Sequence, residues 1–116
     1  MHVMLADIDG VARTAIATLL HRLEGVALVA EVGARSGLSD AVRRHRPDVL
    51  IIDDRLLRST EHVLMGLGPM AAPPRVIVVG MFDEPAFAER AQRLGAEAWV
   101  AKDRADEELP ALLETR

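Results

Sequence analysis

The chain has 116 residues, of which 28% are charged, and a formal net charge of −4. This length suits one domain, and the hydrophobic half of the residues can form a core without covalent staples. The absence of cysteine excludes disulfides and thiolate metal sites, and the acidic balance argues against direct nucleic-acid binding.

The sequence has no targeting signal and no histidine-based metal motif. No apolar run approaches the length of a membrane span, and the opening MHVML lacks the basic region of a signal peptide. The four histidines lie far apart and lack ligand spacing, so they predict no zinc site. We therefore expect a cytoplasmic protein, not attached to a membrane, with a single domain over residues 1–116.

Five short apolar segments, rich in valine and isoleucine, alternate with amphipathic ones. Several of them are apolar without alternation, which is typical of strands covered on both faces of a parallel sheet. The predicted strands are His2–Ala6, Val26–Glu31, Val49–Ile52, Arg75–Val79 and Ala98–Ala101.

The first two intervening segments predict helices. From Val11 onward, apolar residues recur at helical spacing until Gly25 supplies a stop. Ser36 is the expected N-cap of a second helix, which runs to about Arg46 because Pro47 follows.

The remaining helices are predicted by weaker signals. Asp83 is the expected cap of a helix that Gly95 closes, and Ser59–Leu67 has a fainter helical pattern. The last helix, from about Asp106, contains Pro110 and should therefore start late or kink.

Strand–helix alternation repeated five times predicts an α/β fold, with a doubly wound, five-stranded parallel sheet and helices on both faces. Right-handed crossovers restrict the topology, and the flavodoxin-like order 2-1-3-4-5 is the common solution at this length. Ligands of such sheets bind at the carboxyl ends of the first and third strands.

Carboxylates gather at the ends of those two strands. Asp7 and Asp9 follow the first strand, and Asp53 and Asp54 close the third. In the predicted sheet these ends are neighbours, so at least three carboxylates would converge and repel one another unless a cation neutralises them. Such a set of oxygen ligands predicts a Mg²⁺ site. Taken singly, Asp9 and Asp54 are equally well explained as caps of turns or helices.

Lys102 is the single lysine among 14 basic residues. Sequence drift explains this, and so does a site that needs a compact ammonium group, which arginine does not mimic. At the end of the predicted fifth strand, its ammonium group would point at the same edge of the sheet. It could pair there with Asp53 and later with a phosphoryl group.

The runs PDVLIIDDR, LGAEAWVAKD and VMLADIDGVART are similar to the receiver half of LuxR-type response regulators, and the resemblance covers nearly the whole chain. In that family a histidine kinase donates a phosphoryl group to an aspartate after the third strand, in a Mg²⁺-dependent step. The resemblance implies Asp53 as phosphoacceptor, Lys102 as the phosphoryl-contacting lysine and Asp7 as a metal ligand. Further metal ligands would be Asp53 itself and the backbone carbonyl of Arg55.

The chain departs from the family pattern at several positions. Ile8 occupies the place of the second paired acid, which weakens the expected Mg²⁺ site unless Asp9 replaces it. Gly80 stands where the family has a serine or threonine hydroxyl, and Leu57 replaces a common proline. Trp99 occupies the aromatic switch position. It is bulky for an inward swing, although Gly80 leaves space beside it.

Three functions stay open at this point. The first is a receiver that is phosphorylated on Asp53 and regulates an output by dimerisation or protein contact. The second is a pseudo-receiver that binds proteins without phosphorylation. The third is a phosphatase of the haloacid-dehalogenase type, which DIDGV resembles. The acids of IIDD precede Lys102, against that family's motif order, so we expect no enzymatic activity.

The resemblance also implies partners. A histidine kinase is the expected phosphodonor, and a homodimer could form through the helix near Phe82, Phe87 and Ala88, although Phe87 is better explained as core. A DNA-binding domain is expected outside this chain, which itself has no helix-turn-helix segment.

Overall fold

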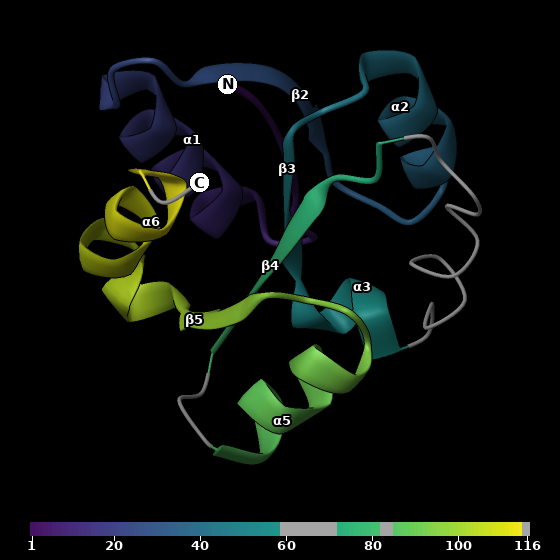
Figure 1. Ribbon diagram of the computed structural model, residues 1–116, viewed down its shortest axis with the longest axis vertical. Coiled ribbons are helices and arrows are strands. Elements are labelled where there is room, and N and C mark those ends of the chain that lie inside the picture. Colours follow the sequence, from purple (N-terminus) through teal and green to yellow (C-terminus); the bar gives the residue numbers. More distant parts are fainter. Residues whose placement is uncertain (59–71, 82–84, 115–116) are drawn as a thin grey trace.

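The sheet has the predicted topology. The computed structural model describes residues 1–58, 72–81 and 85–114. Its five strands are all parallel and lie in the order β2-β1-β3-β4-β5, which confirms the predicted order (Figure 1). The strands are β1 His2–Ala6, β2 Ala27–Val32, β3 Val49–Asp53, β4 Arg75–Gly80 and β5 Ala98–Ala101. Each predicted strand therefore agrees with the observed one to within one residue at either end.

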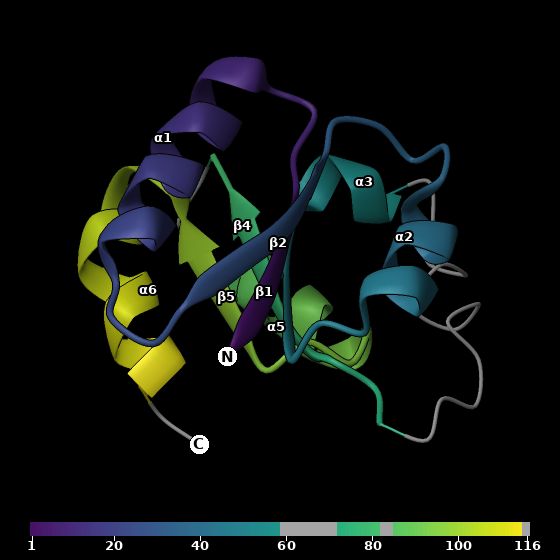
Figure 2. The same ribbon diagram turned by 90° about the horizontal axis from the view of Figure 1, so that it is seen from above.

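Helices cover both faces of the sheet. They are α1 Gly10–Arg22, α2 Leu38–His45, α3 Asp54–Arg58, α5 Pro85–Arg93 and α6 Ala105–Glu114, with a 3₁₀ turn at Lys102–Arg104. Figures 1 and 2 show α1 and α6 together on one face and α2, α3 and α5 on the other. None of the helices in the described part of the chain is long and apolar enough to cross a membrane.

Two apolar layers result from the alternation of strand side chains. Leu5 and Ile51 belong to the layer under α1 and α6, whereas Met4 and Leu50 belong to the layer under α2, α3 and α5. All four of these side chains are fully buried. The segments Val3–Ala6 of β1 and Val49–Ile52 of β3 are buried on both faces, which is why they are apolar at every position. The same alternation decides on which face of the sheet each polar side chain at a strand end lies.

Two predictions about helix ends are wrong. The N-cap of α2 is Gly37 rather than Ser36, because the backbone turns there through the left-handed region at a φ of 79°, where glycine has no steric cost. Helix α6 begins at Ala105 and runs through Pro110. The amide that Pro110 lacks would have bonded the carbonyl of Asp106, which lies in an exposed first turn where water can replace it. The predicted helix Ser59–Leu67 lies outside the described residues.

Candidate functional site

The carboxyl ends of β1 and β3 bring two acids together. Ala6 pairs with Ile52 in the parallel ladder, so the next residues, Asp7 and Asp53, emerge side by side. They follow the alternation of Leu5 and Ile51, and both are buried, with exposed fractions of 0% and 1%. Buried carboxylates at this spacing need positive partners, because neither water nor distance relieves their repulsion.

Lys102 is one of those partners. Its Nζ lies 3.1 Å from Asp7 Oδ1, 2.9 Å from Asp7 Oδ2 and 3.2 Å from Asp53 Oδ2. The Asp7 Oδ2 contact is close enough for an ion pair but lacks hydrogen-bond geometry. The side chain comes from the turn directly after β5, at the same edge of the sheet. The structure thus brings Asp7, Asp53 and Lys102 together, as the sequence predicted.

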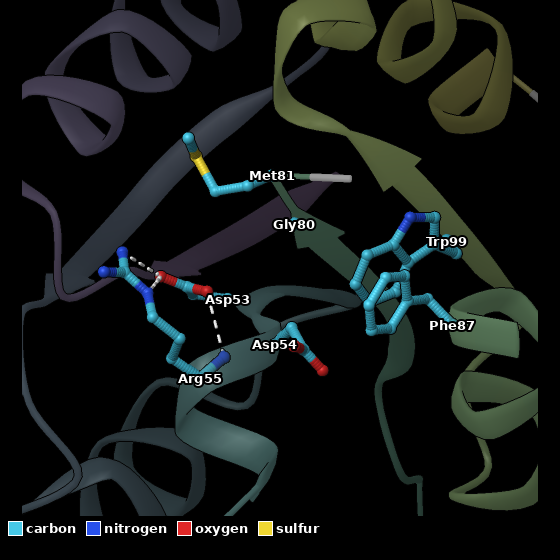
Figure 3. Close-up of a pocket in the computed structure, with 7 residues that line it drawn as sticks. All are labelled: Asp53, Asp54, Arg55, Gly80, Met81, Phe87 and Trp99. Atoms are coloured by element: carbon cyan, nitrogen blue, oxygen red, sulfur yellow. Dashed lines mark hydrogen bonds and ion pairs between the residues drawn. The ribbon is translucent and has the colours of Figure 1, made fainter. Parts of the chain in front are cut away.

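Arg55 is the second partner, and the sequence did not predict its side chain here. Its Nε and Nη2 donate to Asp53 Oδ2 at 3.1 and 2.8 Å, and its backbone N–H donates to Asp53 Oδ1 at 3.0 Å (Figure 3). Nη2 also lies 3.7 Å from Asp7 Oδ1. The sequence offered one signal for Arg55, namely its position in the first turn of α3, two residues after Asp53. That position implied a role for its backbone carbonyl and none for its side chain.

These contacts set different protonation preferences for the two acids. Burial raises the pKa of Asp7 above its ordinary 3.8, and the neighbouring Asp53 carboxylate adds to that rise. Burial would also raise the pKa of Asp53, but hydrogen bonds with Arg55 and Asp7, together with the positive charge of Lys102, outweigh it and hold that pKa at about 2. Asp53 is therefore ionised at neutral pH, which a nucleophilic carboxylate requires.

The other two acids of the predicted cluster serve local structure. Asp9 is the N-cap of α1, and its Oδ1 accepts from the backbone N–H groups of Val11 and Ala12 at 3.0 and 3.4 Å. Asp54 follows the opposite alternation and pairs with Arg90 of α5 at 3.0 Å. The expectation that at least three carboxylates converge is therefore wrong for the described residues, because helix capping and a second ion pair take two of them.

The carboxylates that could hold a divalent cation are already paired with cationic side chains. Mg²⁺ takes about six oxygen ligands in near-octahedral geometry, and water often supplies several of them. Among residues 1–58, 72–81 and 85–114 no group of three or more His, Asp or Glu side chains could hold a metal ion. Ile8, in the place of the second acid, is 47% exposed and offers no oxygen from its side chain. Asp7 and Asp53, which the sequence predicted as ligands, already contact Lys102 and Arg55.

The Asp54–Arg90 ion pair connects α5 to the first residue of α3, directly after β3. The Asp54 side chain is 9% exposed and that of Arg90 is 25% exposed, so solvent screens the pair only in part. We expect Arg90→Ala to lower the free energy of unfolding by about 1–2 kcal/mol, measured by urea denaturation. Arg93→Ala, at an exposed position on the same helix, is the control and should change it by less than about 0.5 kcal/mol. Equal effects of the two substitutions would contradict a structural role for the pair.

The indole of Trp99 occupies the space beside Gly80. A Cβ built on Gly80 would lie 2.3 Å from two atoms of the indole ring. The ring also stacks on Phe87 of α5, with centroids 5.2 Å apart and an angle of 14° between the planes. The space that the sequence predicted beside Gly80 is therefore filled by the indole, whereas the expectation that its bulk restricts an inward swing stays a prediction. Phe87 is half-buried between Trp99 and the neighbouring cavity, so the expectation that it is a core residue is not confirmed, and Phe82 lies outside the described residues.

A small cavity of about 120 Å³ separates this aromatic pair from the acidic cluster. Its lining combines charged residues from the end of β3 with apolar residues of β4, α5 and β5, namely Asp53, Asp54, Arg55, Gly80, Met81, Phe87 and Trp99 (Figure 3). Met81, at the end of β4, is 65% exposed. The cavity thus borders both Asp53 and an exposed side chain.

Comparisons with known proteins agree with this geometry. The oxygen regulatory protein NreC of Staphylococcus epidermidis is 26% identical over 111 residues, which cover 94% of this chain and 51% of NreC. A LuxR-family two-component response regulator from an Aurantimonas species is 26% identical over 97% of this chain and 81% of that one, with a TM-score of 0.82. The chain is homologous to LuxR-type response regulators. It spans about half the length of its curated relatives, and no protein-family model matches it.

The receiver fold is shared with proteins of lower similarity. The isolated receiver domain of RcsB from Salmonella enterica is 24% identical, with a TM-score of 0.84 over 98% of this chain and 85% of that one. The resemblance seen in PDVLIIDDR and LGAEAWVAKD is therefore confirmed in both sequence and fold. The assignment of individual roles to Asp7, Asp53 and Lys102 stays a prediction.

Proposed function

We propose that this chain is a receiver domain of two-component signalling that accepts a phosphoryl group on Asp53 from a histidine kinase. The observation that carries the proposal is the buried Asp53 carboxylate at the end of β3, within 3.2 Å of the single lysine. This arrangement occurs in a chain homologous to LuxR-type response regulators. A cytoplasmic location is part of the same proposal.

Phosphoryl transfer needs an ionised acceptor and positive charge around the transferred group. In the proposed step an Asp53 oxygen forms a bond to phosphorus while the P–N bond of phosphohistidine breaks, and the leaving imidazole nitrogen keeps that electron pair. Lys102 would contact the phosphoryl oxygens and stabilise their charge. The Arg55 guanidinium already donates two N–H groups to Asp53, and it could donate to the oxygens of the transferred phosphoryl group instead. Receivers typically bind Mg²⁺ at this place, and we expect only weak Mg²⁺ binding here.

Intact-mass spectrometry after incubation with acetyl phosphate tests the acceptor. We expect wild type to gain the mass of one phosphoryl group and Asp53→Asn to gain none. Lys102→Met should lose most of the adduct because a charged contact to the phosphoryl group is gone. Asp103→Asn, an exposed acid in the same turn, is the control and should react like wild type. An adduct that persists in Asp53→Asn would rule out Asp53 as the acceptor.

A phosphorylation-independent pseudo-receiver is the second candidate. It is favoured by Gly80, which offers no hydroxyl, and by the packing of Trp99 against it. A pseudo-receiver would give no adduct with acetyl phosphate and no thermal shift with beryllium fluoride, which imitates a bound phosphoryl group. A homodimer, or a DNA-binding domain outside these residues, is the output that the resemblance implies for either candidate.

A further inference from the structure

The acidic cluster is neutralised by the chain itself. Two buried carboxylates, Asp7 and Asp53, meet two cations, Lys102 and Arg55. Two acids with Lys102 alone would keep one net negative charge in a place where burial makes such a charge costly. Arg55 supplies the missing positive charge, since its Nη2 lies 2.8 Å from Asp53 Oδ2 and 3.7 Å from Asp7 Oδ1.

Arg55 contacts the same oxygens that a divalent cation would need. Its side chain donates two hydrogen bonds to Asp53 Oδ2, and its backbone N–H donates one to Asp53 Oδ1. A cation placed between Asp7 and Asp53 would have to displace the guanidinium or share these oxygens with it. Within the described residues no third carboxylate joins Asp7 and Asp53, because Ile8 has none and Oδ1 of Asp9 caps α1.

We propose that Arg55 is the built-in counter-ion of the acceptor, in place of a divalent cation between Asp7 and Asp53. The proposal deepens the proposed function, on which its phosphorylation arm rests. The Arg55 side chain is 44% exposed, whereas those of the two acids are 0% and 2% exposed. A guanidinium in this position can turn outward when another cation takes its place, while the acids stay fixed. Arg55 is thus a positioning residue for Asp53 and a competitor of Mg²⁺.

Calorimetric titration of Mg²⁺ and Mn²⁺ tests the competition without any phosphodonor. We expect Arg55→Met, which keeps much of the aliphatic stem and removes the charge, to bind either ion at least about tenfold more tightly than wild type. Arg55→Lys restores a cation and should return the affinity to within about threefold of the wild-type value. Arg104→Met, which removes a half-exposed arginine from the turn after β5, is the charge-matched control and should resemble wild type.

Equal Mg²⁺ affinity of wild type and Arg55→Met would overturn the proposal, and so would tighter binding by wild type. If circular dichroism shows that Arg55→Met does not fold, the NMR resonance of Arg55 Nε–H in wild type tests the competition instead. Competition predicts that saturating Mg²⁺ shifts this resonance as the bond to Asp53 Oδ2 breaks. A resonance that stays in place while the ion binds would contradict the competition.

Acetyl phosphate labelling with Mg²⁺ or with EDTA is the second arm. We expect EDTA to lower the amount of phosphorylated wild type by less than about threefold relative to Mg²⁺. It should lower the amount of phosphorylated Arg55→Met by at least about tenfold. A wild-type adduct that depends on Mg²⁺ as strongly as that of the variant would contradict the counter-ion role. If neither protein is labelled under any condition, the proposed function fails, whereas the metal titration still decides the role of Arg55.

Discussion

Replacing Gly80 by alanine is expected to displace the Trp99 indole and to lower the free energy of unfolding by about 2–3 kcal/mol. The added Cβ would lie 2.3 Å from two ring atoms, which is far inside van der Waals contact. The ring must then leave its place against Gly80 and lose its stacking on Phe87, or the backbone must shift. Because Trp99 is the single tryptophan, its fluorescence reports the move directly, and we expect a red shift of the emission maximum.

A matched control separates ring displacement from the general effect of alanine. Gly10→Ala adds the same atom in α1, where the nearest side-chain atom is 3.8 Å away. It should leave the emission unchanged and alter stability by less than about 1 kcal/mol. In a Trp99→Leu background, Gly80→Ala should cost clearly less than in wild type, because the clashing ring is absent. Unchanged emission and stability in Gly80→Ala would show that the indole does not need this space.

Replacing Asp7 by asparagine is expected to raise the free energy of unfolding at neutral pH. Burial raises the pKa of Asp7 above 3.8, so its ionised form is disfavoured in the folded protein. Between pH 3.8 and the raised value the folded state binds more protons than the unfolded state. The wild-type free energy of unfolding should therefore fall as the pH rises through this window, and the cost persists above it.

Asp53 contributes with the opposite sign. Its pKa of about 2 lies below the ordinary 3.8, so its stabilisation is present above pH 3.8 and is lost as the pH falls toward 2. Urea denaturation from about pH 4 to about pH 8 isolates the Asp7 effect, because Asp53 stays ionised throughout. The gain from Asp7→Asn should grow with pH, whereas Asp103→Asn should show no such trend. A loss of stability in Asp7→Asn at neutral pH would mean that pairing with Lys102 outweighs the cost of burial.

The sequence by itself determined the sheet and most of what lies at its edge. Runs such as Val49–Ile52 are apolar at every position, so they had to be buried on both faces, and the intervening helical patterns left one common topology. That topology puts Asp7, Asp53 and Lys102 at the carboxyl ends of their strands, where parallel neighbours meet. These predictions rest on chain order and periodicity, which are local properties.

The tertiary structure decided which partner each polar side chain contacts. Asp9 caps α1, which is one of the two roles that the sequence left open, whereas Asp54 pairs with Arg90 of α5. The partner of Asp54 depends on side-chain direction and on helix placement, and no local pattern encodes either. The same holds for Arg55, whose reach onto Asp53 depends on the angle at which α3 leaves β3.

Packing between Gly80 and Trp99 was only partly predictable from the sequence. The resemblance indicated space beside Gly80, but it did not show that the indole fills it. The two residues are complementary in volume, because the space without a side chain at Gly80 holds the ring of Trp99. Close packing couples residues that are far apart in the chain, so only the folded structure decides whether a departure is a loss or an exchange.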